Sequence, residues 1–180
     1  MQWVDSTGAT YVGFVHRVSN ARHGFGFTAF SNGVVHRGEY RDNKRVGIGR
    51  QLYPRDNDAE EAEGEEAVFE GEWKDDKMHG SFRVECFDFV YEGEIKNNKK
   101  NGRGKWKASK HSRRAGEIYE GEWQDNKKHG KGKLLSRNGD LYDGEFHNDE
   151  KHGQGTMLYK NGREQTGEWC LDSFMAEDDD

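Results

Sequence analysis

One short motif recurs along the chain at a nearly fixed spacing. It consists of an aromatic residue, a Gly-Glu pair, two Asn or Asp residues, and a glycine nine positions after the first. The fullest copies are YEGEIKNNKKNGRG at 91–104, YEGEWQDNKKHGKG at 119–132 and YDGEFHNDEKHGQG at 142–155. The leading glycines Gly121, Gly144 and Gly167 are 23 residues apart. A period of this size indicates a repeat protein in which a single unit cannot bury its own apolar face. We therefore expect function on an extended surface and not in a catalytic pocket.

The composition favours a thin, well-solvated structure. Only 31% of the residues are hydrophobic and 34% are charged, which is a balance typical of disorder, but aromatic residues make up 12% and fall in register with the glycines. Cys86 and Cys170 lack the spacing of a disulfide framework, which favours a reducing compartment. No apolar run approaches the roughly 20 residues that span a bilayer, and the N-terminus lacks the pattern of a signal peptide. We expect a cytoplasmic protein without a transmembrane segment.

The alternation within one motif predicts a β-hairpin. In a strand over 119–123, the aromatic residues and the glycine lie on one face, and the two glutamates lie on the other. The Asx pair and the next glycine tolerate the positive φ angles of a tight turn, so the chain is expected to reverse and return. In the simplest register Glu122 faces Lys131 and Glu120 faces Lys133, which makes one face a ladder of opposite charges and the other aromatic over glycine.

The repeats predict an all-β fold, an elongated, twisted, single-layer antiparallel sheet of stacked β-hairpins. Asn-Gly turns are expected to join one hairpin to the next. The array covers 11–169, with units that begin near residues 11, 36, 69, 91, 119 and 142 and a half unit at 165 that does not return. Residues 1–10 are expected to form an N-terminal half-repeat strand, and residues 170–180 an acidic C-terminal tail. The unpaired edge strands could join a second copy of the chain, giving a homo-oligomer.

The string YEGEWQDNKKHGKGKLLSRNGDLYDGEF resembles tandem MORN (membrane occupation and recognition nexus) repeats. The units at 36–50, 91–105, 119–135 and 142–158 carry both pattern glycines and the Asx loop, whereas the unit at 69–90 lacks the second glycine. The resemblance implies one hairpin per repeat and a twisted single-layer sheet with a concave aromatic face. It also implies a non-catalytic role, as a scaffold in cytoskeletal or ciliary assemblies, a dimerisation module, a binder of helical segments, or a contact for phosphoinositides.

The aromatic row is the predicted partner-binding groove. Its first role is packing, but a single-layer sheet cannot hide both faces, so part of the row is expected to be accessible or covered by a partner protein. An amphipathic helix or an extended segment is the natural occupant. The predicted groove residues are Tyr40, Phe69, Trp73, Tyr91, Tyr119, Trp123, Tyr142, Phe146 and Trp169.

A basic stretch over 96–114 contains nine Lys or Arg residues and no acid. These are Lys96, Lys99, Lys100, Arg103, Lys105, Lys107, Lys110, Arg113 and Arg114. The stretch is either a solvated insertion or a contact for an acidic protein, anionic lipid or nucleic acid. The net charge of −6 and the acidic insertion at 56–66 weaken the last two, because a net-negative protein is repelled from phosphates. We therefore expect no nucleic-acid partner and favour a protein scaffold, with a peripheral adaptor for anionic phosphoinositides as the alternative.

Three possible chemical sites are better explained by the repeat itself. The row formed by His23, His79, His129 and His152 is spaced at roughly 10 Å intervals, too far apart to converge on one metal ion. Glutamate pairs such as Glu120 and Glu122 sit on an open charged face that nothing shields from water. The GxG spacings lack a phosphate-loop motif and a following helix. We therefore expect no metal, no cofactor and no enzymatic activity.

Overall fold

The computed structural model describes residues 2–54 and 67–175, and in them the chain forms strands and no helix. The acidic insertion at 56–66 and the acidic residues of the predicted tail beyond 175 lie outside the described residues. The chain divides into two compact units, which are described separately below. The first unit comprises residues 1–87 with 95–98, and the second comprises residues 88–94 with 99–180.

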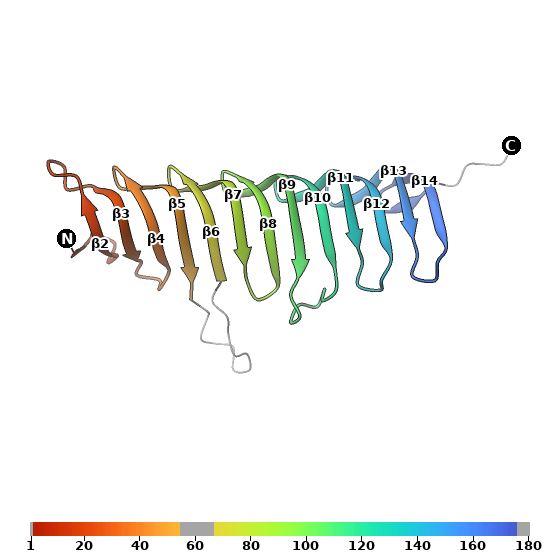
Figure 1. Cartoon of the computed structure of the whole chain (residues 1–180), viewed down its shortest axis with the longest axis horizontal. Helices are drawn as coiled ribbons and strands as arrows, with labels where there is room; N and C mark the ends of the chain where they lie inside the picture. Colours follow the sequence, from red (N-terminus) through yellow and green to blue (C-terminus); the bar gives the residue numbers. More distant parts are fainter. Residues whose placement is uncertain (1, 55–66, 176–180) are drawn as a thin grey trace. The chain divides into compact units, whose positions relative to one another are not determined.

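In each unit, strands that are consecutive in the sequence are neighbours in the sheet (Figure 1). The first unit contains β1 (Gln2–Val4), β2 (Thr10–Val15), β3 (Arg22–Ala29), β4 (Val35–Arg41), β5 (Lys44–Tyr53), β6 (Ala67–Lys74) and β7 (Lys77–Glu85). Strand β8 (Phe89–Lys96) contributes residues to both units. The second unit continues with β9 (Lys99–Ala108), β10 (Ile118–Gln124), β11 (Lys127–Leu135), β12 (Leu141–His147), β13 (Glu150–Leu158), β14 (Glu164–Cys170) and β15 (Ser173–Phe174). The predicted all-β fold of stacked antiparallel hairpins is confirmed.

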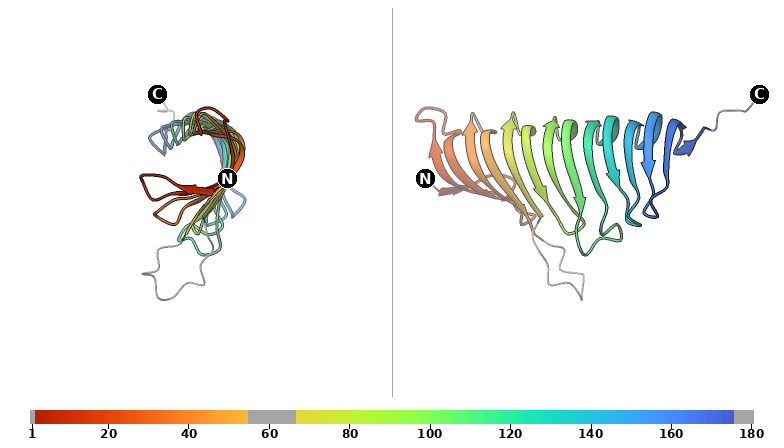
Figure 2. Two further views of the ribbon diagram at one scale, coloured as in Figure 1. Left: turned by 90° about the vertical axis from the view of Figure 1, so that its left-hand side faces the viewer. Right: turned by 45° about the vertical axis from the view of Figure 1, so that its right-hand side comes forward.

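Each sheet has two chemically distinct faces. Individual strands bend along their length, as the views in Figure 2 show. Side chains converge on the inner side of a bend and diverge on the outer side, so we assign the face with the buried aromatic rings, such as Tyr119 and Trp123, to the inner side. We call it the inner face. The opposite side, which carries Glu120 and Lys133 in the same hairpin, is the outer face.

The register within a hairpin agrees with the prediction only as far as a β-bulge. Tyr119 pairs with Leu134 and Glu120 with Lys133, as expected, but the register then shifts, and Glu122 lies opposite His129 in place of Lys131. Gly130 and Lys131 have no partner on β10. The chain bends at Gly130, which has φ +56°, and the Glu122 carboxylate accepts a hydrogen bond from the Lys131 backbone N–H at 3.3 Å. The predicted side-chain pair between Glu122 and Lys131 is therefore wrong, because the carboxylate caps the bulge.

Glycine leaves room for a tyrosine to lie flat on the sheet. The Tyr119 ring lies over Gly121 and Gly132, which pair with each other, and its hydroxyl donates to the backbone oxygen of Glu122 at 2.8 Å. A Cβ built at Gly132 would lie 2.5 Å from that hydroxyl oxygen, closer than real Cβ contacts allow. The same arrangement recurs under Tyr142, whose burial raises the pKa of its hydroxyl to about 12. The second unit therefore requires glycine at these positions.

Adjacent hairpins are joined through their rings. Within the second unit, Tyr119 meets Trp123 and Phe146 edge-to-face, with ring centroids 5.0 and 5.1 Å apart. Tyr142 meets Phe146 and Trp169 in the same way, at 5.2 and 5.3 Å. Edge-to-face pairs contribute about 0.5–1.5 kcal/mol each beyond their burial. The core of this unit is therefore a continuous row of rings, formed from residues that no single hairpin could bury.

A second link joins adjacent hairpins at the loop ends. The Asp149 carboxylate accepts a hydrogen bond from the backbone N–H of Lys128 at 2.9 Å, and the Asp149 N–H donates to the carbonyl of Lys128, also at 2.9 Å. This two-bond clasp is repeated between equivalent residues. The other pairs are Asn43 with Arg22, Asp76 with Arg45, Asn98 with Met78, Asn126 with Lys100, and Asp172 with Lys151.

The last repeat is not the half unit that the sequence predicted. After β14 the chain turns at Leu171 and Asp172, which both have positive φ, and returns as β15. The Phe174 ring then packs against Trp169 at 5.4 Å. The return was not expected because the turn has leucine where the other units have Asn or Asp. It places an aromatic ring beside the last tryptophan.

Candidate functional site

Within each unit the predicted groove residues lie on the inner face, but their rings are largely sealed. Eight of the nine are buried, with an exposed fraction that runs from 0% at Tyr91 to 7% at Trp123. Neighbouring rings and long side chains cover them. The buried members are Tyr40, Trp73, Tyr91, Tyr119, Trp123, Tyr142, Phe146 and Trp169. A partner that binds this face would therefore contact mainly the side chains that cover the rings.

Phe69 differs from the other members of the row because it is only half-buried. In its hairpin Phe82 stands where the other return strands have the second glycine, and the Phe82 ring occupies the place over Gly71 that a tyrosine takes elsewhere. Phe82 packs edge-to-face on Trp73 at 5.6 Å. Phe69 packs instead against Tyr53, with ring centroids 4.9 Å apart.

A row of cationic side chains covers the rings. In the second unit the Lys100 ammonium lies 4.4 Å from the Trp123 ring centroid, Lys128 lies 5.6 Å from Phe146, and Lys151 lies 5.3 Å from Trp169. Burial lowers the pKa of Lys128, and Asp149 opposes that shift. We call Arg22, Arg45, Lys100, Lys128 and Lys151 the cation row.

Sequence reasoning missed the cation row, although a signal was present. Each member stands two positions before the loop glycine of its hairpin, as in Lys128 before Gly130, and is therefore repeated with the motif. Of the five, only Lys100 was named from the sequence, as part of the basic stretch. Their role depends on contact with rings of the adjacent hairpin, which one hairpin considered alone does not show. Met78 occupies the equivalent place in β7.

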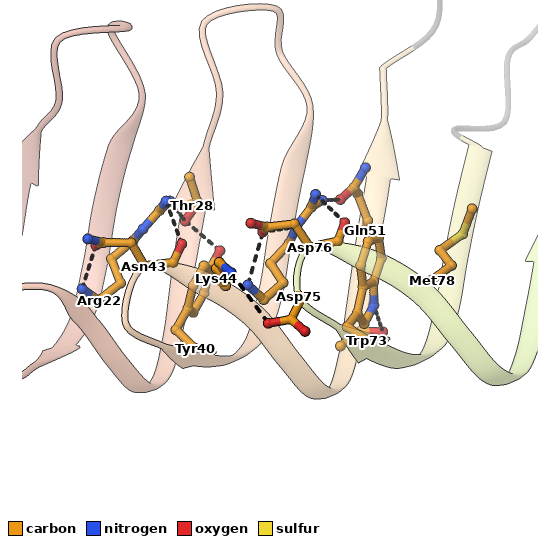
Figure 3. A network of polar contacts seen from close by, with 12 residues as sticks. Arg22, Thr28, Tyr40, Asn43, Lys44, Gln51, Trp73, Asp75, Asp76 and Met78 are labelled. Atoms are coloured by element: carbon orange, nitrogen blue, oxygen red, sulfur yellow. Dashed lines mark hydrogen bonds and ion pairs between the residues drawn. The ribbon is translucent and has the colours of Figure 1, made fainter. Parts of the chain in front are cut away.

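In the first unit the cation row belongs to a buried polar network (Figure 3). Thr28 is fully buried and shares a hydrogen bond of 2.6 Å with the Tyr40 hydroxyl. The Arg45 guanidinium donates to the side-chain oxygen of Gln51 at 2.5 Å and, through Nε, to Asp76 at 3.0 Å. Arg45 also lies 4.4 Å from the Trp73 ring centroid. Polar side chains therefore fill positions that are apolar in the second unit.

His36 is the most unusual member of that interior. It stands where other hairpins have the tyrosine that covers the glycine pair, and it is fully buried. Neither ring nitrogen has a hydrogen-bond partner among residues 2–54 and 67–175. Burial, together with the positive charge of Arg45, lowers the pKa of His36 to about 4. The imidazole is therefore neutral at pH 7 and packs as a ring against Tyr40 and Trp73.

The predicted basic stretch is not a single surface. Lys100 belongs to the inner face, whereas Arg103, Lys105 and Lys107 alternate onto the outer face of β9. Lys105 pairs with Glu120 at 3.1 Å. Lys99 pairs with Asp125, and Arg114 with Glu117. Lys96, Lys110 and Arg113 are exposed in β8 and in the loop before β10. Three of the nine basic residues are therefore paired with neighbouring acids.

The outer face of the second unit carries the expected charge ladder. A shallow hollow of about 530 Å³ there is lined by charged side chains over glycine, including the Lys105–Glu120 pair and Lys133, which lies 2.6 Å from Asp143. Opposite charges across strands fix the register but add little stability at a solvated surface. The charged side chains that line this hollow are exposed, and the hydrogen bond to Asp143 raises the pKa of Lys133.

Searches for a metal site and for a membrane span gave no candidate in the described ranges. No group of three or more His, Cys, Asp or Glu residues among them could hold a metal ion. His129, His147 and His152 do approach one another at the loop edge, with ring centroids 5.0 Å (His129–His147) and 5.7 Å (His147–His152) apart. No helix long and apolar enough to cross a bilayer is found in the described part of the chain.

Comparison with known proteins agrees with the repeat geometry. The family profile described as MORN repeat matches six segments that together cover more than half of the chain. They are residues 18–35, 36–57, 69–81, 91–113, 119–141 and 142–162. No curated protein matches the chain.

Proposed function

Because the chain belongs to the MORN repeat family, whose members are generally protein- or membrane-binding modules, we propose that it is a non-catalytic scaffold that binds a partner protein on its inner face. The proposed location is a cytoplasmic, cytoskeletal or ciliary assembly, as the resemblance implies. The predicted groove residues supply the packed floor of this surface. The cation row supplies its accessible polar part.

The cation row is the observation that carries the proposal. Successive members in one unit lie two strands apart, which is about 10 Å. A helix rises 1.5 Å per residue, so acidic side chains about seven residues apart on a partner helix match this spacing. The half-buried Lys128 and Lys151 present ammonium groups beside ring edges. The expected partner is therefore an amphipathic segment with a periodic acidic stripe and apolar neighbours.

The test begins with the protein that co-purifies with the tagged full chain. Deleting the rings is a poor test because they form the core, so the charge of the cation row is reversed instead. Lys128→Glu and Lys151→Glu are expected to weaken partner binding at least tenfold, with an unchanged circular dichroism spectrum. Lys131→Glu, on the exposed outer face of the same strand, is the matched control and is expected to leave affinity unchanged.

Two results would contradict the proposal. Undiminished affinity in the folded double variant would move the binding site off the inner face. Sedimentation of the isolated chain with anionic vesicles, abolished by reversing the charges of Lys105, Lys107 and Arg113, would favour the membrane adaptor.

A further inference from the structure

Large apolar side chains are exposed on the outer face of the first two complete hairpins, β2–β3 and β4–β5. Phe25 and Phe27 are 48% and 40% exposed, and Ile48 is 59% exposed. In the second unit the equivalent outer positions hold charged residues, such as Lys131 for Phe25 and Lys133 for Phe27. Val12 likewise stands where β10 has Glu120. Water-exposed apolar groups that cluster in this way mark binding surfaces.

Val12, Phe25 and Phe27 line a hollow of about 550 Å³ on the first unit. Its floor is the paired glycines Gly13 and Gly26, which leave the backbone bare. The other lining residues are Val35, Arg37, Arg50 and Leu52. The hollow is thus apolar apart from two arginines, and no acidic side chain lines it.

The two arginines form a like-charge pair that the fold itself does not explain. Arg37 and Arg50 lie directly opposite each other on β4 and β5. The equivalent pair in the next hairpin is Glu70 with Arg83, which is of opposite charge. Like charges directly across two strands destabilise a sheet. Neither Arg37 nor Arg50 forms an ion pair with any residue that the structure describes, although Glu70 lies opposite Arg50 on β6.

We propose that this outer surface is a second docking site, for a partner protein segment that combines a large apolar side chain with a carboxylate. The apolar side chain fills the hollow between Phe25 and Phe27. The carboxylate lies between the guanidinium groups of Arg37 and Arg50 and relieves their repulsion. Arg37 is already near the apolar surface, with its guanidinium carbon 5.5 Å from the Phe25 ring centroid.

A protein segment fits this surface better than a lipid bilayer does. The apolar groups line a hollow and do not project as a wedge, so they receive a side chain more readily than they enter a membrane. Exposed acids on the same face, Glu39 and Glu70, repel anionic headgroups. The site lies on the opposite face from the cation row, so its test does not depend on the proposed inner-face function.

A random twelve-residue peptide display library, selected on the full-length chain, tests the site. The doubly substituted Phe27→Lys, Arg37→Glu chain serves for counter-selection. The enriched peptides are expected to pair aromatic or aliphatic residues with Asp or Glu. The affinity of a labelled consensus peptide is then measured by fluorescence anisotropy. It is expected to be at least tenfold weaker for the Phe27→Lys chain and for the Arg37→Glu chain than for the unmodified chain. A control peptide with Lys in place of its acidic residues is expected not to bind.

Folding defects do not mimic this result. Arg37→Glu replaces the like-charge pair by an opposite-charge pair and is expected to keep or raise the thermal midpoint. Lys133→Glu on the second unit and Lys128→Glu on the inner face are expected to leave peptide affinity unchanged. The proposal is overturned if no peptide is preferred over the doubly substituted chain, if the lysine copy binds equally well, or if Phe27 is needed for vesicle binding instead.

Discussion

The first two complete hairpins (β2–β5) and the hairpins β10–β13 share the same backbone arrangement but carry different side chains on their two faces. In β10–β13 the inner face is sealed by rings together with buried Leu134 and Met157, and the outer face is a charge ladder. In β2–β5 the equivalent inner positions hold buried Thr28 and Gln51, and the outer face exposes phenylalanines and Ile48. In β2–β5, polar side chains have thus entered the inner face and apolar side chains the outer face.

This difference shows which features of the hairpin the fold requires and which it leaves free. Both regions keep the glycine pair, the bulge and the loop clasp, because these set the backbone. These backbone features do not determine which face carries the polar side chains, because a single-layer sheet leaves one face in contact with solvent in either case. The second unit keeps the charge ladder on its outer face, whereas the first unit exposes apolar side chains there.

The largest expected effect on stability concerns the glycines that lie beneath a tyrosine ring in the second unit and beneath the His36 ring in the first. Gly132→Ala is expected to lower the free energy of unfolding by about 3 kcal/mol, because the new methyl group meets a Tyr119 ring held in place by its hydrogen bond. Gly49→Ala is expected to cost about 1 kcal/mol less, because the His36 ring above it is held by packing against Tyr40 and Trp73 but by no hydrogen bond. Urea unfolding measures both, and equal losses would contradict this account.

The next effect is a pH dependence of stability that originates at His36 in the first unit. The pKa of His36 is about 4 in the folded chain and about 6.5 when unfolded, so the unfolded state binds the proton first. Stability is complete above pH 6.5 and falls as the pH drops toward 4, by about 2 kcal/mol at pH 5. Urea unfolding at pH 7 and pH 5 checks this expectation. A His36→Tyr chain is expected to lose this part of the dependence, and an unchanged pH profile in that variant would contradict it.

A smaller effect on stability is expected when His36 is replaced by the tyrosine that other repeats have at this position. At pH 7, His36→Tyr is expected to raise the free energy of unfolding by about 1 kcal/mol, because a tyrosine hydroxyl there can donate to the backbone oxygen of Glu39 as its counterparts do. The reverse change, Tyr119→His, is expected to destabilise the chain. If His36→Tyr destabilises it instead, the polar network around Arg45 requires the smaller ring.

The smallest effect concerns the cation row. Lys128→Met reproduces the residue that β7 has at Met78, keeping most of the side-chain packing while removing the charge over two rings. A change in stability of about 0.5–1 kcal/mol is expected from the lost cation–π contact. Thermal unfolding at low and high salt measures it. A much larger loss would show that this charge is part of the core and is not available to a partner.

The sequence predicted the hairpins, their turns and the face of each ring, because glycine, Asx and aromatic spacings act within a single hairpin. It did not predict the bulge, since the Glu122 carboxylate can pair across the strand or cap the bulge, and only the backbone geometry decides between them. It also missed the sealing of the rings. That depends on Lys128 of one hairpin contacting Phe146 of the next, and on the Asp149 clasp that aligns them.

Ring-current shifts in the proton NMR spectrum give the most direct test of a ring lying flat on each glycine pair. The α-protons of Gly121 and Gly132 lie beneath Tyr119 and are expected well upfield of their random-coil positions. In a Tyr119→Leu chain the α-proton shifts of Gly121 and Gly132 are expected to move to their random-coil positions, while those of Gly144 and Gly155 beneath Tyr142 stay upfield. Random-coil shifts for all four glycines in the unmodified, folded chain would contradict the packing on which both binding surfaces rest.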